Sequence, residues 1–162
     1  MKKKIYLDYA STTPLDPKVL KAMMPYFKNA FGNPSSAHSF GQFARAAIEK
    51  ARETVALFLN TRAQEIIFTS GATEANNLAI RGIVKSEIRN SKPHIITSQI
   101  EHESVLSPCE VLEQEGIAEV TYIPVDKEGI VQVEDVKKAI KENTALVSIM
   151  YANSEIGTVQ PI

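Results

Sequence analysis

Apolar side chains recur along the chain at two spacings, and their alternation predicts an α/β fold. Short apolar runs typical of buried strands occupy residues 65–70, 94–98, 119–123 and 145–150. Stretches with apolar residues three or four positions apart, typical of helices, separate them at about 73–89, 103–115 and 133–141. Because such helices carry the chain back across the sheet, we expect a mostly parallel sheet with helices on both faces, a three-layer α/β/α arrangement.

The first sixty residues have a different pattern. Residues 1–16, which include a small and polar segment from Ala10 to Pro14, predict an extended arm. Asp16 is placed to cap a helix that has Pro17 at its first position, and Pro25 should kink or restart that helix. A second helical stripe covers about residues 42–59. We therefore expect three parts: an arm over 1–16, helices over 17–60 and the α/β part over 61–162.

Composition narrows the class of protein. The 162 residues carry a formal net charge of -1, whereas nucleic-acid binders and membrane-surface proteins need clustered Lys and Arg. No stretch approaches the roughly 18 apolar residues of a spanning helix. Cys109 is the single cysteine, so it cannot form an internal disulfide, and no Cys/His cluster predicts a metal site. No apolar run follows the basic residues 2–4, so we expect a cytoplasmic protein.

Candidate chemistry lies where predicted strands end. Gly71 leads from one strand directly into a helix, whose amide groups and the Thr73 hydroxyl predict an anion site. The spacing matches no P-loop or dinucleotide fingerprint, so a phosphate-bearing cofactor of another kind is favoured. The alternative is a plain turn with Thr73 as a helix cap.

Three other residues have both a functional and a structural interpretation. His102 follows the next strand and could stack on a planar cofactor or move protons, or it could simply cap a helix. Asn153 follows the last strand and could bind a cofactor hydroxyl or close a turn. Cys109 lies among apolar helix positions, which favours a buried structural thiol over a nucleophile.

Taken in order, five segments resemble the amino-terminal part of a cysteine desulfurase of the NifS/IscS group, a family of fold-type I pyridoxal-phosphate enzymes. The segments are YLDYASTTP (6–14), FGNPSSAH (31–38), TSGATEANN (69–77), EHESVL (101–106) and ANSEIGTVQ (152–160). The resemblance implies that Ala72 and Thr73 hold the phosphate of pyridoxal 5'-phosphate, that His102 stacks on its ring, and that Asn153 contacts its phenolic oxygen. Ser154 departs from the second Asn that the family often has.

The same resemblance implies a reaction and partners. Family members take sulfur from L-cysteine, giving L-alanine and an enzyme persulfide that supplies iron–sulfur scaffold proteins or other sulfur acceptors, and they form homodimers. From the near-zero net charge, we expect no direct nucleic-acid partner and no membrane association. Another fold-type I enzyme, such as a selenocysteine lyase or an aminotransferase, is the alternative within enzymes.

Several residues that the family reaction needs have no counterpart here. The chain contains no Ser-x-His-Lys string for the cofactor lysine, and the family's persulfide cysteine, pyridinium-pairing aspartate and carboxylate-binding arginine belong to later sequence. We therefore expect the amino-terminal portion of a longer enzyme, with an incomplete cofactor domain over 61–162, that is inactive alone. A non-catalytic module that dimerises or binds desulfurase partners is the alternative from another class.

Overall fold

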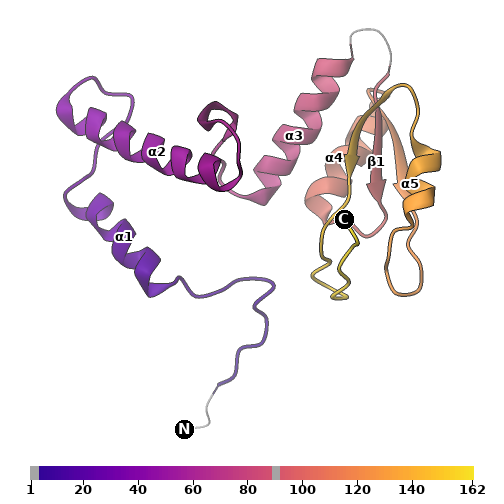
Figure 1. The fold of residues 1–162 in the computed structure, drawn as a ribbon, viewed down its shortest axis with the longest axis horizontal. Coiled ribbons are helices and arrows are strands. Elements are labelled where there is room, and N and C mark those ends of the chain that lie inside the picture. Colours follow the sequence, from indigo (N-terminus) through magenta and orange to yellow (C-terminus); the bar gives the residue numbers. More distant parts are fainter. Residues whose placement is uncertain (1–3, 89–91) are drawn as a thin grey trace. The chain divides into compact units, whose positions relative to one another are not determined.

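A computed structural model describes residues 4–88 and 92–162. The chain forms two compact units, one that ends at Phe68 and one that begins at Thr69. Figure 1 shows their helices and strands. We describe each unit by itself.

The first unit is built from helices. Its elements are α1 (Pro17–Lys28), α2 (Ser39–Phe58) and the short 3-10 helix η1 (Ala63–Glu65). The Asp16 carboxylate accepts a hydrogen bond from the Lys18 amide at 2.6 Å, which confirms the predicted cap. The predicted restart at Pro25 is wrong, because α1 is continuous to Lys28; the amides of Asn29 and Ala30 both bond to the Pro25 carbonyl.

The predicted strand at residues 65–70 is also wrong. Ile66 has an extended backbone, yet no strand in the described residues pairs with this segment. The guanidinium of Arg52 donates to the Ile66 carbonyl and lies 5.0 Å from the ring centroid of Phe68. A side chain from α2 therefore bonds a carbonyl that a strand partner would otherwise use, and the apolar run remains an exposed connection.

The second unit contains a parallel sheet in the order β2-β1-β3. The strands are β1 (His94–Ser98), β2 (Glu119–Ile123) and β3 (Thr144–Ser148), and the helices are α3 (Ala72–Glu87), α4 (Glu103–Gln114) and α5 (Val133–Ala139). These bounds confirm three of the four predicted strands and all three predicted helices. Arg89, the expected end of the first helix, lies outside the described residues.

Alternate side chains of β1 point to opposite faces of the sheet. Ile95 packs in a cluster with residues of α3 and α4, such as Val84 and Cys109. Ile96 packs in a separate cluster with Ile123 and Val131, against which α5 lies. Helices therefore cover both faces (Figure 1), and the predicted three-layer α/β/α arrangement is confirmed for this unit.

Candidate functional site

The three strands are parallel, so their carboxyl ends meet at one edge of the sheet. Ligands of open α/β sheets bind beyond this edge. The loop that leads into α4 follows β1, and the loop that contains Asn153 follows β3. His102 and Asn153 can belong to one site only if these two loops lie close together.

The start of α3 leaves backbone donors available. Gly71 occupies the cap position, and within the described residues no side chain caps this end of the helix. The Thr69 hydroxyl donates to the Gly71 carbonyl at 3.1 Å and closes the turn. The amide groups of Ala72 and Thr73 belong to the first helical turn, where intrahelical acceptors are lacking and the helix dipole favours an anion.

One carboxylate lies near this helix start. Glu74 Oε2 accepts hydrogen bonds from the Ser70 amide at 2.7 Å and from the Ser70 hydroxyl at 2.6 Å. These bonds lower the pKa of Glu74 below its ordinary value. The Glu74 carboxylate therefore uses the donors of Ser70 and leaves the amides of Ala72 and Thr73 as the donors for a ligand.

His102 caps α4, which confirms the structural interpretation of this residue. Its Nδ1 accepts the Ser104 amide at 3.0 Å and lies 2.9 Å from the Ser104 hydroxyl. Because Nδ1 accepts an N–H, the ring proton of the neutral imidazole lies on Nε2. The rest of the ring is exposed.

A pocket of about 330 Å³ brings Thr73 and His102 together. Its lining residues come from α3 and from the beginning of α4: Thr73, Asn77, Arg81, His102, Glu103, Ser104, Ser107, Pro108 and Val111. Ala72 and Asn153 are not among them. The start of α3 and the cap of α4 therefore line one pocket from neighbouring helices, and the roles predicted for Thr73 and His102 stay predictions.

Asn153 closes the turn that follows β3. Its Oδ1 accepts the amides of Glu155 at 2.8 Å and Ile156 at 3.0 Å, which is turn chemistry. Its Nδ2 donates to the Ile100 carbonyl at 2.9 Å. The amide therefore links the loop after β3 to the loop that carries His102.

Glu101 is a residue of this edge that the sequence reasoning missed. Only 8% of its surface is exposed, and its Oε1 accepts the Ser98 hydroxyl at 2.9 Å and the Met150 amide at 2.6 Å. The carboxylate thereby joins the ends of β1 and β3. The available signal was an acidic residue shortly after the end of a predicted buried strand, where a charge needs partners to be buried.

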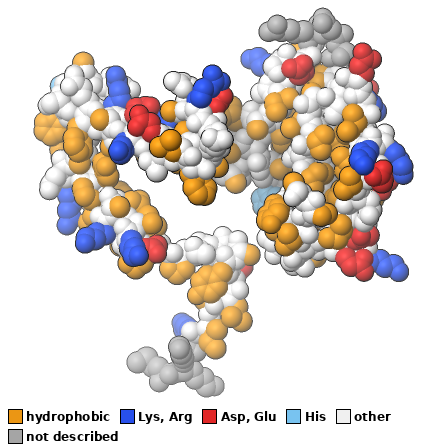
Figure 2. Space-filling model, in the orientation of Figure 1, with side chains coloured by type: hydrophobic (Ala, Val, Ile, Leu, Met, Phe, Trp, Pro, Cys, Tyr) orange, Lys and Arg blue, Asp and Glu red, His pale blue; other side chains and the backbone are white. Residues whose placement is uncertain are grey.

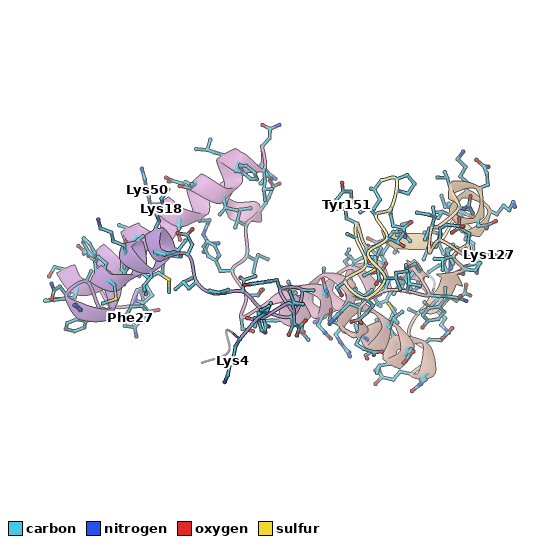
Figure 3. The ribbon with its side chains drawn as sticks, turned by 90° about the horizontal axis from the view of Figure 1, so that it is seen from below. Lys4, Lys18, Phe27, Lys50, Lys127 and Tyr151 are labelled. Carbon is cyan, nitrogen blue, oxygen red and sulfur yellow. The ribbon has the colours of Figure 1, made fainter. Side chains whose placement is uncertain are left out.

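Gln160 anchors the loop after β3 from its other end. The side chain is 3% exposed; its Oε1 accepts the Val131 amide at 2.9 Å, and its Nε2 donates to the Gly129 carbonyl at 2.7 Å. Tyr151, labelled in Figure 3, lies on the same loop and is exposed. Two buried polar side chains, those of Glu101 and Gln160, thus hold the segment that contains Asn153.

Cys109 is a structural residue of α4. It is fully buried, and burial raises the pKa of its thiol to about 11, with a further contribution from the charge of Glu101. This confirms the prediction of a buried thiol, and a raised pKa is typical of an unreactive one. Among the described residues, no group of three or more His, Cys, Asp or Glu side chains is arranged to hold a metal ion.

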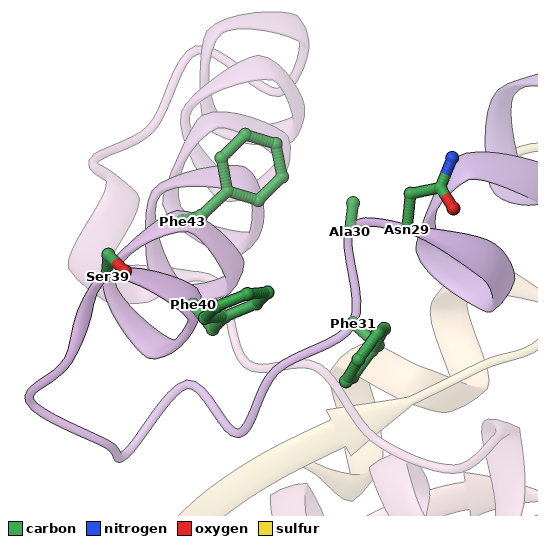
Figure 4. A pocket seen from close by; sticks show the side chains of 6 residues that line it. All are labelled: Asn29, Ala30, Phe31, Ser39, Phe40 and Phe43. Carbon is green, nitrogen blue, oxygen red and sulfur yellow. The ribbon is translucent and has the colours of Figure 1, made fainter.

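The first unit has a pocket of its own, of about 420 Å³. Figure 4 shows the three aromatic side chains that dominate its wall, Phe31, Phe40 and Phe43. It lacks titratable lining residues and therefore offers no acid–base chemistry. In the described part of the chain, no helix is both long and apolar enough to cross a membrane.

The profile of the family described as "Aminotransferase class-V" matches residues 5–162. The chain belongs to this family. Family members are pyridoxal-phosphate enzymes, which agrees with the cofactor predicted from the sequence. The class-V assignment covers the whole predicted site, from the start of α3 to the loop that contains Asn153.

Three relatives indicate the group within the class-V family to which this chain is similar. "Cysteine desulfurase IscS" of Dictyoglomus turgidum is 54% identical over 162 residues, which are 100% of this chain and 41% of the relative. A solved "NIFS-LIKE PROTEIN" is 42% identical with a TM-score of 0.92, over 98% of this chain and 43% of that one. The structure "SspA in complex with cysteine" is 44% identical with a TM-score of 0.88, over 96% and 44%.

These similarities confirm the resemblance to the NifS/IscS group and the fold-type I architecture. The class-V chain spans about two fifths of the length of the relatives it matches. The residue roles at the site are not part of this result, and they remain predictions.

Proposed function

We propose that this chain is the amino-terminal part of a pyridoxal-phosphate-dependent cysteine desulfurase. The observation that carries the proposal is the pocket between α3 and α4 that Thr73 and His102 share, in a chain 54% identical to a desulfurase. The proposed domains are an arm over residues 1–16, helices over 17–60 and an incomplete cofactor domain over 61–162.

The residues present fit the phosphate group of the cofactor. An uncapped helix start with a glycine at its cap accepts an anion, and the Thr73 hydroxyl adds a donor from a lining residue of the pocket. Ala72 contributes its amide. We assign both residues to phosphate binding.

Two further residues fit the ring of the cofactor. His102 is exposed, and the hydrogen bond from the Ser104 amide to its Nδ1 holds the imidazole in one orientation for stacking on a planar ring. Asn153 is assigned to the phenolic oxygen, with the loop around it held by Glu101 and Gln160. When bound, pyridoxal phosphate supplies the electron sink for the chemistry, and the protein supplies orientation and electrostatics.

For the enzyme that contains this chain, we propose L-cysteine as substrate, with L-alanine and an enzyme persulfide as products. A solved relative described as a complex with cysteine supports this substrate. The test is sulfide release from L-cysteine by the complete protein loaded with the cofactor. Transamination without sulfide release would favour an aminotransferase, and faster reaction with selenocysteine would favour a lyase.

The phosphate assignment has its own test. Replacing Thr73 with Val removes one donor, so we expect the complete protein to retain pyridoxal phosphate roughly tenfold less tightly. Thr54→Val is the matched control, because the Thr54 hydroxyl donates to a carbonyl within α2. Equal retention by both variants would contradict the assignment of Thr73.

We propose that the isolated chain is inactive, since it has no counterpart of the cofactor lysine or the persulfide cysteine. Pyridoxal phosphate followed by borohydride should give no adduct at one defined lysine, by mass spectrometry. A single modified lysine would overturn this expectation.

Partners and location complete the proposal. We propose a homodimer for the complete protein, delivery of sulfur to iron–sulfur scaffold proteins or other acceptors, and a cytoplasmic location. A buried free thiol at Cys109 suits a reducing compartment. Sedimentation of the complete protein, capture of persulfide-receiving proteins and cell fractionation test these three points separately.

A further inference from the structure

We propose that Asn76 and Ser104 are positioning residues for His102. Through two consecutive hydrogen bonds they hold its neutral imidazole in the form that carries the proton on Nε2. Neither residue was singled out by the sequence, and the family resemblance assigns neither of them a role here. The importance of this tautomer for cofactor stacking rests on the proposed function, whereas the tautomer itself can be measured in this chain without the cofactor.

The contacts run from α3 to α4. Asn76 Nδ2 lies 2.8 Å from Ser104 Oγ, and Ser104 Oγ lies 2.9 Å from His102 Nδ1. The Ser104 amide donates to the same Nδ1 at 3.0 Å. Ser104 is only 7% exposed, so water has little access to its hydroxyl.

The direction of each hydrogen bond follows from the groups involved. The Asn76 amide nitrogen can only donate, so the Ser104 oxygen accepts from it. The single proton of the Ser104 hydroxyl is then available to His102 Nδ1. Nδ1 therefore receives two donors and keeps its lone pair, which places the ring proton on Nε2.

The Ser104 amide by itself already favours an unprotonated Nδ1, and Asn76 adds to this preference. A serine hydroxyl can either donate or accept, and without a donor behind it the hydroxyl is freer to turn and accept a proton from Nδ1. Burial increases the effect, since little solvent competes for the hydroxyl. The side-chain amide of Asn76 on α3 thus reinforces the protonation pattern of the His102 ring at the start of α4.

These hydrogen bonds define which ring nitrogen of His102 donates and which one accepts. In the neutral ring, Nε2 of His102 donates a hydrogen bond and does not accept one. Since the proposed function gives His102 the task of stacking on the cofactor ring, the Asn76–Ser104 pair would keep the imidazole oriented for that task.

The test is nitrogen NMR of the 15N-histidine-labelled chain, at a pH well above the ordinary imidazole pKa of about 6.5. We expect an unprotonated Nδ1 and a protonated Nε2 for His102. The substitution Asn76→Asp replaces the donor by an acceptor, so the hydroxyl should turn toward the carboxylate. The fraction of the Nδ1–H form should then rise roughly two- to tenfold.

Matched controls separate this effect from charge and helix stability. Asn77→Asp introduces the same charge one position along α3, where the native amide donates to the Thr73 carbonyl. Ser107→Ala removes a hydroxyl of α4 that bonds to Glu103. Both controls should leave the His102 tautomer unchanged.

A second pair keeps the test decisive if Asn76→Asp does not fold. Ser104→Ala should raise the Nδ1–H fraction, and Ser104→Thr, which keeps a hydroxyl, should restore the native value. An unchanged tautomer in folded Asn76→Asp or Ser104→Ala overturns the proposal. The NMR test uses no cofactor and is therefore independent of the sulfide-release test. If His102 has the expected tautomer but the complete protein releases no sulfide, only the proposed function is contradicted.

Discussion

At the scale of single residues, burial decides which polar and titratable side chains can react. Cys109 and His94 are both fully buried, yet only His94 has polar partners. Its Nδ1 lies 2.9 Å from the Thr144 hydroxyl and its Nε2 lies 2.8 Å from the Thr121 hydroxyl. Each residue leads to a measurable prediction.

Cys109 should be unreactive in the folded chain, because burial raises the pKa of its thiol to about 11 and blocks access. We expect a disulfide reagent such as DTNB to titrate no thiol under native conditions and one thiol in denaturant. The reaction rate should follow unfolding. Rapid stoichiometric reaction of the native chain would contradict the burial of Cys109.

His94 should make the chain less stable in mild acid. Burial, together with the charge of Lys141, lowers its pKa in the folded state. As the pH falls through about 6.5, the unfolded chain binds a proton that the folded chain excludes, so the free energy of unfolding decreases by at most about 1.4 kcal/mol per pH unit. The decrease from this residue ends below the folded-state pKa.

Denaturant unfolding between about pH 8 and pH 5 measures this effect. His94→Gln should show a smaller loss of stability over that range than the native chain. The control is His38→Asn, because His38 caps α2 and Asn is a normal cap. Equal pH dependence in the native chain and His94→Gln would show that His94 is not responsible.

At the scale of elements, the loop after β3 depends on a neighbouring turn. Gly129 has a φ of +78°, and a Cβ there would lie 2.5 Å from Cδ1 of Ile156 and 3.0 Å from Oγ1 of Thr158. Thr158 also donates to the Glu128 carbonyl at 2.6 Å. The absence of a side chain at Gly129 therefore allows the Asn153 loop to dock.

Gly129→Ala should destabilise the chain by about 1–3 kcal/mol, from left-handed backbone strain together with displacement of the Thr158 side chain and of the terminal methyl of Ile156. Gly116→Ala is the matched control: its φ is +72°, but no atom lies within 4 Å of the added Cβ, so about 1–2 kcal/mol is expected. Urea unfolding gives both values. Equal losses would mean that the contact with Ile156 does not matter.

At the scale of the whole molecule, the two units differ in how much apolar surface they bury. Both buried apolar clusters belong to the unit that begins at Thr69. In the first unit, α2 buries only small residues such as Ala44 and Ala56, while Phe58 is 88% exposed. Figure 2 shows hydrophobic side chains at the surface along α1 and α2.

This difference predicts unequal protection in native-state hydrogen exchange. Amides of α1 and α2 should exchange on the order of tenfold or more faster than amides of β1, whose five residues are all buried. Mass spectrometry of peptides from both units measures the rates. Comparable protection in both units would show that the first unit is stabilised by contacts absent from this structure.

Local patterns in the sequence determined most of the second unit. The apolar run of β1 needs burial on both faces, and the stripes of α3, α4 and α5 supply the covering helices, so strand and helix bounds follow from periodicity. The Asp16 cap and the positive φ of Gly116 likewise follow from neighbouring residues alone. The sequence also indicated the family, because each of the five family motifs is a contiguous segment of the chain.

Contacts between distant residues were decided only by the tertiary structure. Residues 65–70 read as a strand, but strand formation requires a partner, and Arg52 bonds to that backbone instead. Glu101 and Asn76 act through Met150 and Ser104, which lie 49 and 28 positions away. Hydrogen bonds between side chains distant in sequence depend on positions in space, so the sequence indicated the chemistry and the helix cap of His102, while only the fold brought Asn76 to Ser104.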